Sequence, residues 1–432
     1  MSQGALLDLV AKGAQDVYLT SKPKMTHFKK SYKRHTNFSK LTTNLNFEGT
    51  LDFGNKNVCK IRRDGDLLGR VYLKMKFPEI KAEDIDTTDD KTDLYLRWTE
   101  STGYSVIENV SIKIGGQEID KQDGIYMQLW SDVTDDQEVK LCLLGNKTYM
   151  IQPLKTQPST TVYAPLKFWF CEEFSHHLPI IALQYHEVEI EVELKNFHSM
   201  YQILRKTGPN TYDYTNYKLK NKNLVDANLT CNYVILDVEE RKKFAQSNHE
   251  YLINQVQKVS YVVQGSKSIP LTFNHPTVEL LWVIQLESIK NKNELLNFSG
   301  QGLYDDDNLP ASLKHNTFLR PHLLSEAKIK LNGIDRTDWQ DNIFYYFVQN
   351  YESHRNCAEH YLYLYSFALD PKKMLEQPSG SLNFSRIDNA ELQVRVNEDY
   401  VKSTDQGTIF VYAINYNILK IQSGMGGLAY SN

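Results

Sequence analysis

The sequence predicts an all-β protein built from two similar units, and three observations support this prediction. Aromatic residues make up 12% of the 432 residues, with 27 tyrosines and 18 phenylalanines, and such side chains suit half-buried sheet surfaces. Short segments with alternating apolar and polar residues recur along the chain. Two of these segments are repeated roughly 200 residues further on. A segment of about this length is the usual size of a domain with a single hydrophobic core.

Strand patterns dominate the chain from Phe47 onward. In residues 188–194, four aliphatic residues alternate with Glu189, Glu191 and Glu193, as expected for a strand with one buried and one solvent-exposed face. Similar patterns occur at residues 67–77, 110–114, 259–263, 278–286, 327–331, 392–396 and 409–419. Turn-forming residues separate them at 115–116, 208–209, 332–333 and 378–380. Many short strands joined by loops of varied length indicate β-sandwiches.

The N-terminal segment differs, because its apolar residues follow helical spacing. One face of a short predicted helix carries Leu6, Leu7, Val10, Ala11 and Ala14. Gly13 weakens this helix. We expect the segment to pack either on its own domain or on a partner.

An internal repeat is the most informative pattern in the sequence. Residues 110–120 resemble residues 327–335, because each has a strand pattern, a tight glycine turn, an aliphatic residue and an aspartate. An aromatic segment follows each copy, and residues 183–193 are then echoed by residues 382–396. Two echoes in the same order favour duplication of one β unit. The polar stretch at 212–223 is the natural joint.

Composition and charge disfavour several classes of protein. The formal net charge is −4, whereas a protein that coats nucleic acid normally carries a basic excess. The sequence contains no CxxC pair among its five cysteines, which argues against a disulfide framework or a zinc ribbon and favours buried, reduced thiols; they are Cys59, Cys142, Cys171, Cys231 and Cys357. Neither a signal peptide nor a stretch of membrane-spanning length is apparent, so we expect a soluble protein made in the cytosol.

Candidate catalytic and metal-binding groups are weak in this sequence. The adjacent pair His176 and His177 would point to opposite faces of a strand, and His354 and His360 are not spaced as a zinc set. The glycine-rich residues 424–427 lack the lysine and hydroxyl residue of a phosphate loop. We therefore predict no catalytic residue, no cofactor and no metal.

The first 40 residues form a basic segment. Eight lysines and arginines stand against Asp8 and Asp16, which gives this segment a charge of +6 and leaves −10 for the rest of the chain. The candidate contact residues are Lys22, Lys24, Lys29, Lys30, Lys33 and Arg34. One interpretation is an arm that binds an acidic partner, and the other is a solvated leader with local salt bridges.

Two long polar segments and several sequons complete the list of candidate surface features. Residues 81–93 are acidic, and residues 291–316 include a run of three aspartates; such loops either carry surface function or are solvated insertions. The sequons that we consider as candidate glycosylation sites are Asn146, Asn228 and Asn297. A cytosolic protein does not meet the secretory glycosylation machinery, so most sequons are expected to be accidental.

Several blocks of the sequence resemble one known family. They lie in residues 9–20, 28–38, 112–120, 168–186, 273–285, 377–388 and 424–432. In these blocks, and in their order, the chain is similar to the major capsid proteins of the nucleocytoplasmic large DNA viruses. The acidic segment 81–93 departs from the family pattern and leaves the virus group open.

The resemblance implies a specific architecture and assembly. It implies two tandem jelly rolls, each of eight antiparallel strands, after a short N-terminal helical segment. The domains would be an arm at 1–26, a first jelly roll at 27–212, a linker at 213–224 and a second jelly roll at 225–432. Three chains would form a pseudo-hexagonal capsomer that tiles the icosahedral shell of a large double-stranded DNA virus.

The resemblance also implies partners and a location. The partners would be the chain itself, first as a homotrimer and then in a trimer–trimer lattice, together with minor capsid, penton and internal virion membrane proteins that the basic arm contacts on the inner side. No sequence-specific nucleic-acid binding is expected, and the protein would occupy the virion, with assembly in the host cytoplasm.

Two alternatives use the same fold. A jelly-roll carbohydrate-binding or host-attachment protein would show exposed tryptophan and tyrosine in a concave site. A jelly-roll hydrolase would need converging carboxylates or a metal set, and the sequence offers neither.

Overall fold

The computed structural model describes residues 4, 7, 9–25, 27, 32, 34–135, 142–145, 149–209, 211–304, 320–355 and 360–431. The chain forms two units, Met1–Phe38 and Ser39–Asn432. In the first unit, helix α2 (Asp16–Thr20) is short and has no buried residue. Of the helix expected over residues 6–14, Leu7 is helical, whereas Leu9 and Val10 lie in a turn and residues 11–13 have no regular structure. Gly13, which favours non-helical backbone, lies in this irregular stretch before α2.

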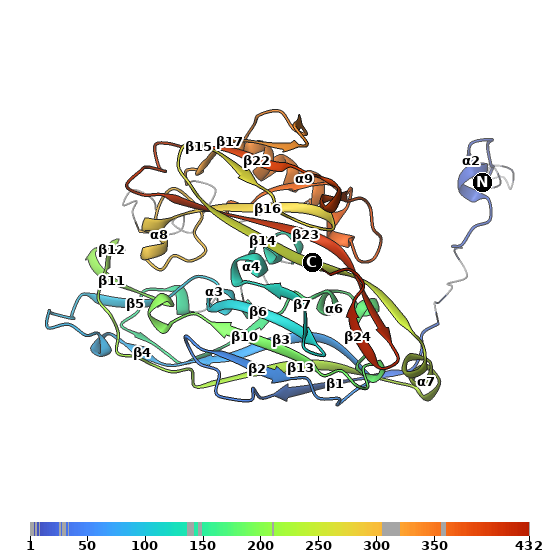
Figure 1. The fold of residues 1–432 in the computed structure, drawn as a ribbon, viewed down its shortest axis with the longest axis horizontal. Coiled ribbons are helices and arrows are strands. Elements are labelled where there is room, and N and C mark those ends of the chain that lie inside the picture. The colour runs from blue at the N-terminus through green and yellow to red at the C-terminus, as the bar shows by residue number, and fades with distance from the viewer. Residues whose placement is uncertain are drawn as a thin grey trace. The chain divides into compact units, whose positions relative to one another are not determined.

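Eight strands of the second unit form a first jelly roll (Figure 1). One sheet has the order β1 (Phe38–Leu45), β13 (Asp226–Leu236), β3 (Leu67–Phe77) and β9 (Thr160–Pro165). The facing sheet has the order β2 (Lys56–Lys60), β10 (Val188–Leu194), β6 (Ile107–Ile114) and β7 (Gln117–Gln122). Numbered along the chain, the strands follow the orders 1-8-3-6 and 2-7-4-5, which is jelly-roll topology.

A second jelly roll repeats these orders. Its first sheet contains β14 (His249–Val263), β23 (Gly407–Gln422), β16 (Pro276–Leu286) and β20 (Tyr363–Ser366). Its second sheet contains β15 (Ser266–Pro270), β22 (Ala390–Val396), β17 (Leu324–Leu331) and β18 (Ile334–Asp335). Three short strands extend these sheets: β19 (Gln340–Asp341), β21 (Leu382–Asn383) and β24 (Met425–Leu428). The predicted pair of antiparallel jelly rolls is confirmed.

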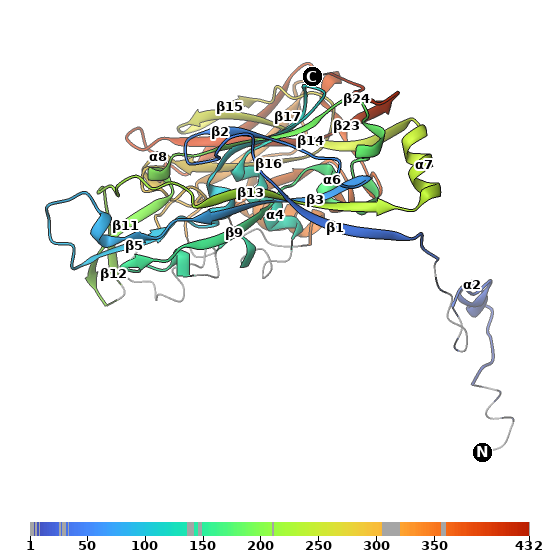
Figure 2. The same cartoon turned by 90° about the horizontal axis from the view of Figure 1, so that it is seen from below.

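The remaining elements decorate or connect the two jelly rolls (Figure 2). A separate sheet contains β12 (Thr211–Thr215), β11 (Tyr201–Gly208) and β5 (Leu94–Trp98), and β4 (Ile80–Lys81) pairs with β8 (Thr156–Gln157). The α-helices are α3 (Thr102–Ser105), α4 (Gly124–Thr134), α6 (Trp169–Glu172), α7 (Val238–Gln246), α8 (Glu287–Asn291) and α9 (Gln349–Ser353). A π-helical turn, η7 (Phe344–Val348), precedes α9. The 3-10 turns are η1 (Ala82–Asp84), η2 (Tyr149–Ile151), η3 (Phe174–His176), η4 (Ile180–Ala182), η5 (Phe197–Ser199), η8 (Pro371–Lys373) and η9 (Phe384–Arg386).

The internal repeat corresponds to equivalent hairpins. The first echo forms β6 and β7 in one jelly roll and β17 and β18 in the other. Both hairpins have two-residue turns with positive φ at each position, 57° and 81° at Gly115 and Gly116 and 49° and 82° at Asn332 and Gly333. Such a turn matches the twist of the flanking strands. The second echo leads into β10 and β22, which occupy the same place in their sheets.

The strand pairing disagrees with the predicted boundary between the domains. Strand β13 falls in the span 225–432 assigned to the second jelly roll, but it pairs with β3 and β1 of the first. The last strand of a jelly roll returns to lie beside its first strand, and the sequence pattern does not reveal this non-local pairing. In the structure, α7 follows β13 and precedes β14.

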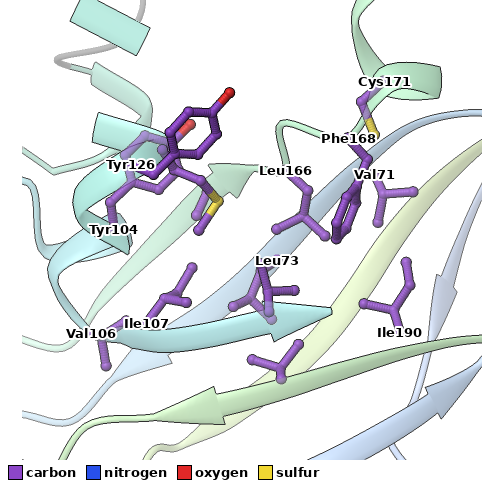
Figure 3. Close-up of a cluster of buried hydrophobic side chains, with 14 of the residues drawn as sticks. Val71, Leu73, Tyr104, Val106, Ile107, Tyr126, Leu166, Phe168, Cys171 and Ile190 are labelled. Atoms are coloured by element: carbon purple, nitrogen blue, oxygen red, sulfur yellow. The ribbon is translucent and has the colours of Figure 1, made fainter. Parts of the chain in front are cut away.

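Both jelly rolls enclose apolar cores. Val71 and Leu73 from β3 and Ile190 from β10 point into the core of the first (Figure 3). The alternation expected at residues 188–194 is confirmed, because the aliphatic residues are buried and the glutamates are half-buried. Cys59, Cys171 and Cys231 are buried as expected, whereas Cys142 is exposed, and Cys357 lies outside the described residues. Within the described part of the chain, no helix is long and apolar enough to cross a membrane.

The seam between the jelly rolls and the candidate contact surfaces

Helix α4 lies between the two jelly rolls and begins at a well-defined cap (Figure 1). Asp123 has extended backbone, and its Oδ1 accepts a hydrogen bond of 2.7 Å from the backbone N–H of Tyr126. A carboxylate at this position satisfies an N–H group that has no partner inside the helix. Nine of the eleven helical residues are buried, which is expected for a helix with protein on opposite sides.

The cap of α4 also binds the second jelly roll. The Asp123 carboxylate accepts from Lys258 Nζ of β14 at 2.6 Å and from the Tyr412 hydroxyl of β23 at 2.9 Å. The rings of Tyr126 and Tyr412 lie 5.8 Å apart. One side chain therefore starts a helix of the first jelly roll and holds two strands of the second. We call this contact, from residues 119–132 to β14, β16, β23, α9 and His360, the seam.

A second carboxyl group bridges the seam beside β7. Asp120 is buried; one of its oxygens accepts from the backbone N–H of Val256 at 3.0 Å, and the other accepts from Gln122 Nε2 at 2.8 Å. The backbone carbonyl of Ile119 accepts from Gln255 Nε2. Burial raises the pKa of the Asp120 carboxyl to about 7, although the two hydrogen bonds favour the charged form.

The centre of the seam contains histidine–carboxylate pairs. The Trp130 ring lies edge-on to His354, and the His354 Nε2 atom is 3.0 Å from Glu279 Oε2, with both of these side chains fully buried. His360 is hydrogen-bonded to Asp132 of α4. The two histidines thus bind different carboxylates. Buried polar groups need such partners. The His360–Asp132 pair joins the two jelly rolls, and the His354–Glu279 pair holds His354 against Trp130 from within the second.

Trp130 also contacts a carboxyl group on the side of the first jelly roll. Its indole N–H donates to Glu172 Oε1 at 2.5 Å, and burial raises the pKa of Glu172 to about 7. Among the described residues, no group of three or more His, Cys, Asp or Glu side chains is arranged to hold a metal ion. The weak candidates His176 and His177 lie in and just after η3, where burial lowers the pKa of both imidazoles.

A further contact joins the jelly rolls near the three-stranded sheet. Asn293 Nδ2 donates to the backbone carbonyls of His198 and Tyr201, both at 2.8 Å. Arg97 of β5 is buried, and its guanidinium donates to the Tyr304 hydroxyl at 2.9 Å. The predicted loop 291–316 therefore begins with contacts to the first jelly roll, while its residues from 305 onward lie outside the described residues.

The predicted contact arm is described only in part. Lys22, Lys24 and Arg34 are exposed, and Lys29, Lys30 and Lys33 lie outside the described residues. Large apolar residues of the same unit are also exposed, among them Leu7, Leu9, Val10, Val17, Tyr18 and Leu19. The arm therefore combines positive charge with uncovered apolar surface.

Two of the three candidate sequons are buried. The amide of Asn228 on β13 donates to Asp226 at 3.3 Å, and the amide of Asn297 donates to Glu294 at 2.6 Å and to the carbonyl of Gln301 at 3.0 Å. A sugar on either nitrogen would displace these contacts. Asn146 lies outside the described residues. Glycosylation stays a prediction at all three positions.

The tryptophan side chains do not form an exposed platform for sugars. Trp98, Trp130, Trp169 and Trp282 are fully buried. Trp339 is half-buried beneath the Arg395 guanidinium, which lies 4.0 Å from the ring centroid. These positions do not favour the carbohydrate-binding alternative.

Two family models cover most of the chain. Residues 26–237 match the family described as major capsid protein N-terminus, and residues 240–427 match the large eukaryotic DNA virus major capsid protein family. The matches meet at the start of α7. The second, more specific model therefore covers the whole second jelly roll.

Full-length relatives agree with these matches. The major capsid protein of Pyramimonas orientalis virus is 36% identical, and that of Phaeocystis pouchetii virus is 34% identical; each alignment covers 99% of this chain and 100% of the relative. The solved structure of the capsid protein VP54 of the chlorella virus PBCV-1 has a TM-score of 0.75 and 27% identity, and covers 94% of this chain and 100% of VP54. The Faustovirus major capsid protein, at 13% identity and a TM-score of 0.71, shares the fold. The chain therefore belongs to the family of major capsid proteins of large eukaryotic DNA viruses, the structural proteins that form the virion shell.

Proposed function

We propose that three copies of this chain form a homotrimeric capsomer of pseudo-hexagonal outline, and that these capsomers tile the icosahedral shell of a large double-stranded DNA virus. The observation that supports this proposal is the presence of two jelly rolls with the same strand orders in one chain. Three chains with two similar jelly rolls each supply six similar blocks around one axis, and a block of hexagonal outline can tile a flat lattice.

The contacts within a trimer and between trimers should differ in strength. An obligate trimer interface of this kind buries about 2,000 Å² or more and is partly apolar. Contacts between trimers should be smaller and more polar, so that misplaced capsomers can leave while many weak contacts together hold the shell. Because polar contacts at exposed surfaces are screened by ions, the lattice should weaken with salt before the trimer does.

Light scattering coupled to size-exclusion chromatography, followed by electron microscopy of the full chain, tests this proposal. The expected particle has three times the 50.1 kDa mass of the chain and a threefold image with a hexagonal outline. A chain that stays monomeric at every concentration tested would overturn the proposal.

We also propose that the basic arm contacts the acidic surfaces of minor capsid, penton and internal virion membrane proteins during assembly in the host cytoplasm. Its exposed cations and apolar side chains support this role. The test variant replaces Lys22, Lys24, Lys29, Lys30, Lys33 and Arg34 with glutamine, and the probe is a vesicle of anionic phospholipid that reports attraction to an acidic surface. The wild type should bind in a salt-dependent manner and the variant should not, while both remain trimeric. Equal binding by the two proteins would contradict this role.

We further propose that the chain has no catalytic, cofactor or metal role and binds no nucleic acid sequence-specifically. The buried pairs His354–Glu279 and His360–Asp132 lie in the seam, where they join parts of the fold rather than face a substrate. We place the boundary between the jelly rolls at α7 because β13 completes the first and β14 begins the second.

A further inference from the structure

The segment that forms α4 in the first jelly roll has a counterpart in the second. Asp341 Oδ1 accepts from the backbone N–H of Phe344 at 2.9 Å, just as Asp123 Oδ1 accepts from the N–H three residues ahead. Each aspartate follows the hairpin with the two-residue turn, and each precedes a helical segment. Asp123 and Asp341 are 218 positions apart, close to the 217 that separate Gly116 and Gly333.

The two counterparts differ in what covers them. In the first jelly roll Trp130 and Val133 are 0% exposed, and the seam covers Trp130 through its contact with His354. In the second jelly roll, Val348 and Tyr351, which lie 218 positions after Trp130 and Val133, are 39% and 74% exposed. Ile334, which follows the hairpin turn where the first jelly roll has the exposed Gln117, is 75% exposed. Ile343 is also exposed, at 52%. We call Ile334, Asp341, Ile343, Val348 and Tyr351 the second helix face.

The seam identifies the kind of surface that this face should meet. In the seam, Asp120 contacts β14 and the cap residue Asp123 contacts β14 and β23, which are the first and last strands of the second jelly roll. The equivalent strands of the first jelly roll are β1 and β13. The first five residues of β1 are exposed, and among the apolar side chains there Leu41 is 37% exposed and Ile235 of β13 is 39% exposed.

The charges on these two surfaces are complementary. Lys258, which pairs with Asp123 in the seam, is five residues before the buried end of β14 at Val263, and Lys40 is five residues before the buried end of β1 at Leu45. Counted from these buried ends, Lys40 has the same place in β1 as Lys258 has in β14. Within the described parts of the chain, neither Lys40 nor Asp341 forms an ion pair, so both charges remain available.

We infer that the second helix face docks on strands β1 and β13 of a second copy of this chain, repeating the seam between subunits, with Asp341 paired to Lys40 of the partner subunit. This inference rests on the proposed homotrimer and specifies the surface through which it forms. A contact between two different surfaces of identical subunits is heterologous. Such contacts form a ring when the rotation that relates one subunit to the next closes after a whole number of copies.

Substitution of Tyr351 tests the apolar part of this surface. Tyr351→Glu places a charge on the helix face, and Val238→Glu is the matched control because Val238 is 69% exposed on α7, which has no counterpart in the repeat. Sedimentation velocity over a dilution series measures the trimer. Tyr351→Glu should raise the concentration at which the trimer dissociates by about tenfold or more, as expected for a charge buried unpaired at an interface, whereas Val238→Glu should leave it unchanged. Circular dichroism confirms that both variants are folded.

A charge exchange tests the specific pairing. Asp341→Lys and Lys40→Asp should each weaken the trimer, and the double variant should recover most of the wild-type stability because the pair is restored with reversed polarity. If the wild type forms a trimer and Tyr351→Glu and both single charge variants dissociate at the same concentration as the wild type, the inference is overturned while the proposed trimer stands. A wild-type chain that never associates would overturn both.

Discussion

Replacing Asp120 with asparagine tests the cost of burying a carboxyl group in the seam. The side chain is 4% exposed, and burial raises its pKa from an ordinary value of 3.8 to about 7. Asparagine has nearly the same shape but does not titrate. Comparison of the two proteins over a range of pH therefore isolates the effect of the charge.

The direction and size of the effect follow from the pKa values. Because folding raises this pKa, the folded state binds the proton more tightly than the unfolded state, and protonation stabilises the fold. This stabilisation is complete below pH 3.8 and is lost as the pH rises through 7. The whole difference corresponds to about 4 kcal/mol, of which roughly 3 kcal/mol is lost between pH 5 and pH 9.

The measurement is equilibrium unfolding in urea at several pH values between 5 and 9. Protein concentration is held constant, because association stabilises the folded chain by mass action. The free energy of unfolding of Asp120→Asn should gain roughly 3 kcal/mol relative to wild type over this range. Any fixed cost of changing the hydrogen bond from Gln122 is the same at every pH and does not affect the slope.

An exposed aspartate provides the control for the pH series. Asp388 lies on the surface, and Asp388→Asn should follow the wild-type profile. If the free energy of unfolding of Asp120→Asn also varies with pH as that of the wild type does, the carboxyl group costs the same to ionise in the folded and unfolded chains, and burial does not raise its pKa.

Four other substitutions probe the seam and are measured by the same unfolding assay. Asp123→Ala should lower the free energy of unfolding by about 2–4 kcal/mol, because it removes a helix cap and leaves buried donors unpaired. Lys258→Ala should lower it by less than about 1 kcal/mol, because the lysine is 38% exposed. Equal losses for the two variants would argue against the dual role of the cap. Leu281→Ala, at a fully buried position facing the first jelly roll, should cost about 2–5 kcal/mol, and a cost below about 1 kcal/mol would mean that this apolar contact is loosely packed. Gly124→Ala should destabilise the protein by about 3 kcal/mol or more, because the added Cβ would lie 2.1 Å from the backbone oxygen of Tyr104; a gain in stability would show that α4 can shift.

The parts of the fold that depend on local sequence were predictable. The alternation in residues 188–194 and the glycine turns define strands and hairpins through neighbouring residues, and the structure confirms them. The repeat extended this local information, because a hairpin recognised once could be matched to a second position. Both hairpins indeed occupy equivalent places in their sheets.

The boundary between the jelly rolls was not predictable in the same way. Strand β13 has a recognisable composition, but its membership of the first jelly roll depends on pairing with β3, some 150 residues earlier in the chain. Sequence order favours assigning a strand to the segment that follows a polar stretch. In jelly-roll topology the last strand instead lies beside the first strand, and no local property of residues 226–236 indicates this pairing.

The seam was missed for a related reason. Asp123, Asp132 and His354 are common polar residues in the sequence, and their partners lie between 75 and 289 positions away. One local signal was available, since an aspartate three residues before an aromatic residue follows the hairpin in both halves, at Asp123 and Asp341. That signal predicts the cap but does not identify what the helix contacts.

Comparison of the two halves explains why the same topology carries different surfaces. The helix after the hairpin is apolar where it meets the second jelly roll of the same chain, which covers Trp130 through His354. In the second jelly roll the equivalent face carries Val348 and Tyr351, which are exposed in the single chain. Isolated exposed apolar residues need no explanation, but a set at positions equivalent to a buried contact does. The proposed contact between subunits would account for these apolar residues, because the repeated unit would then make one kind of contact throughout the proposed capsomer, once within each chain and once between chains.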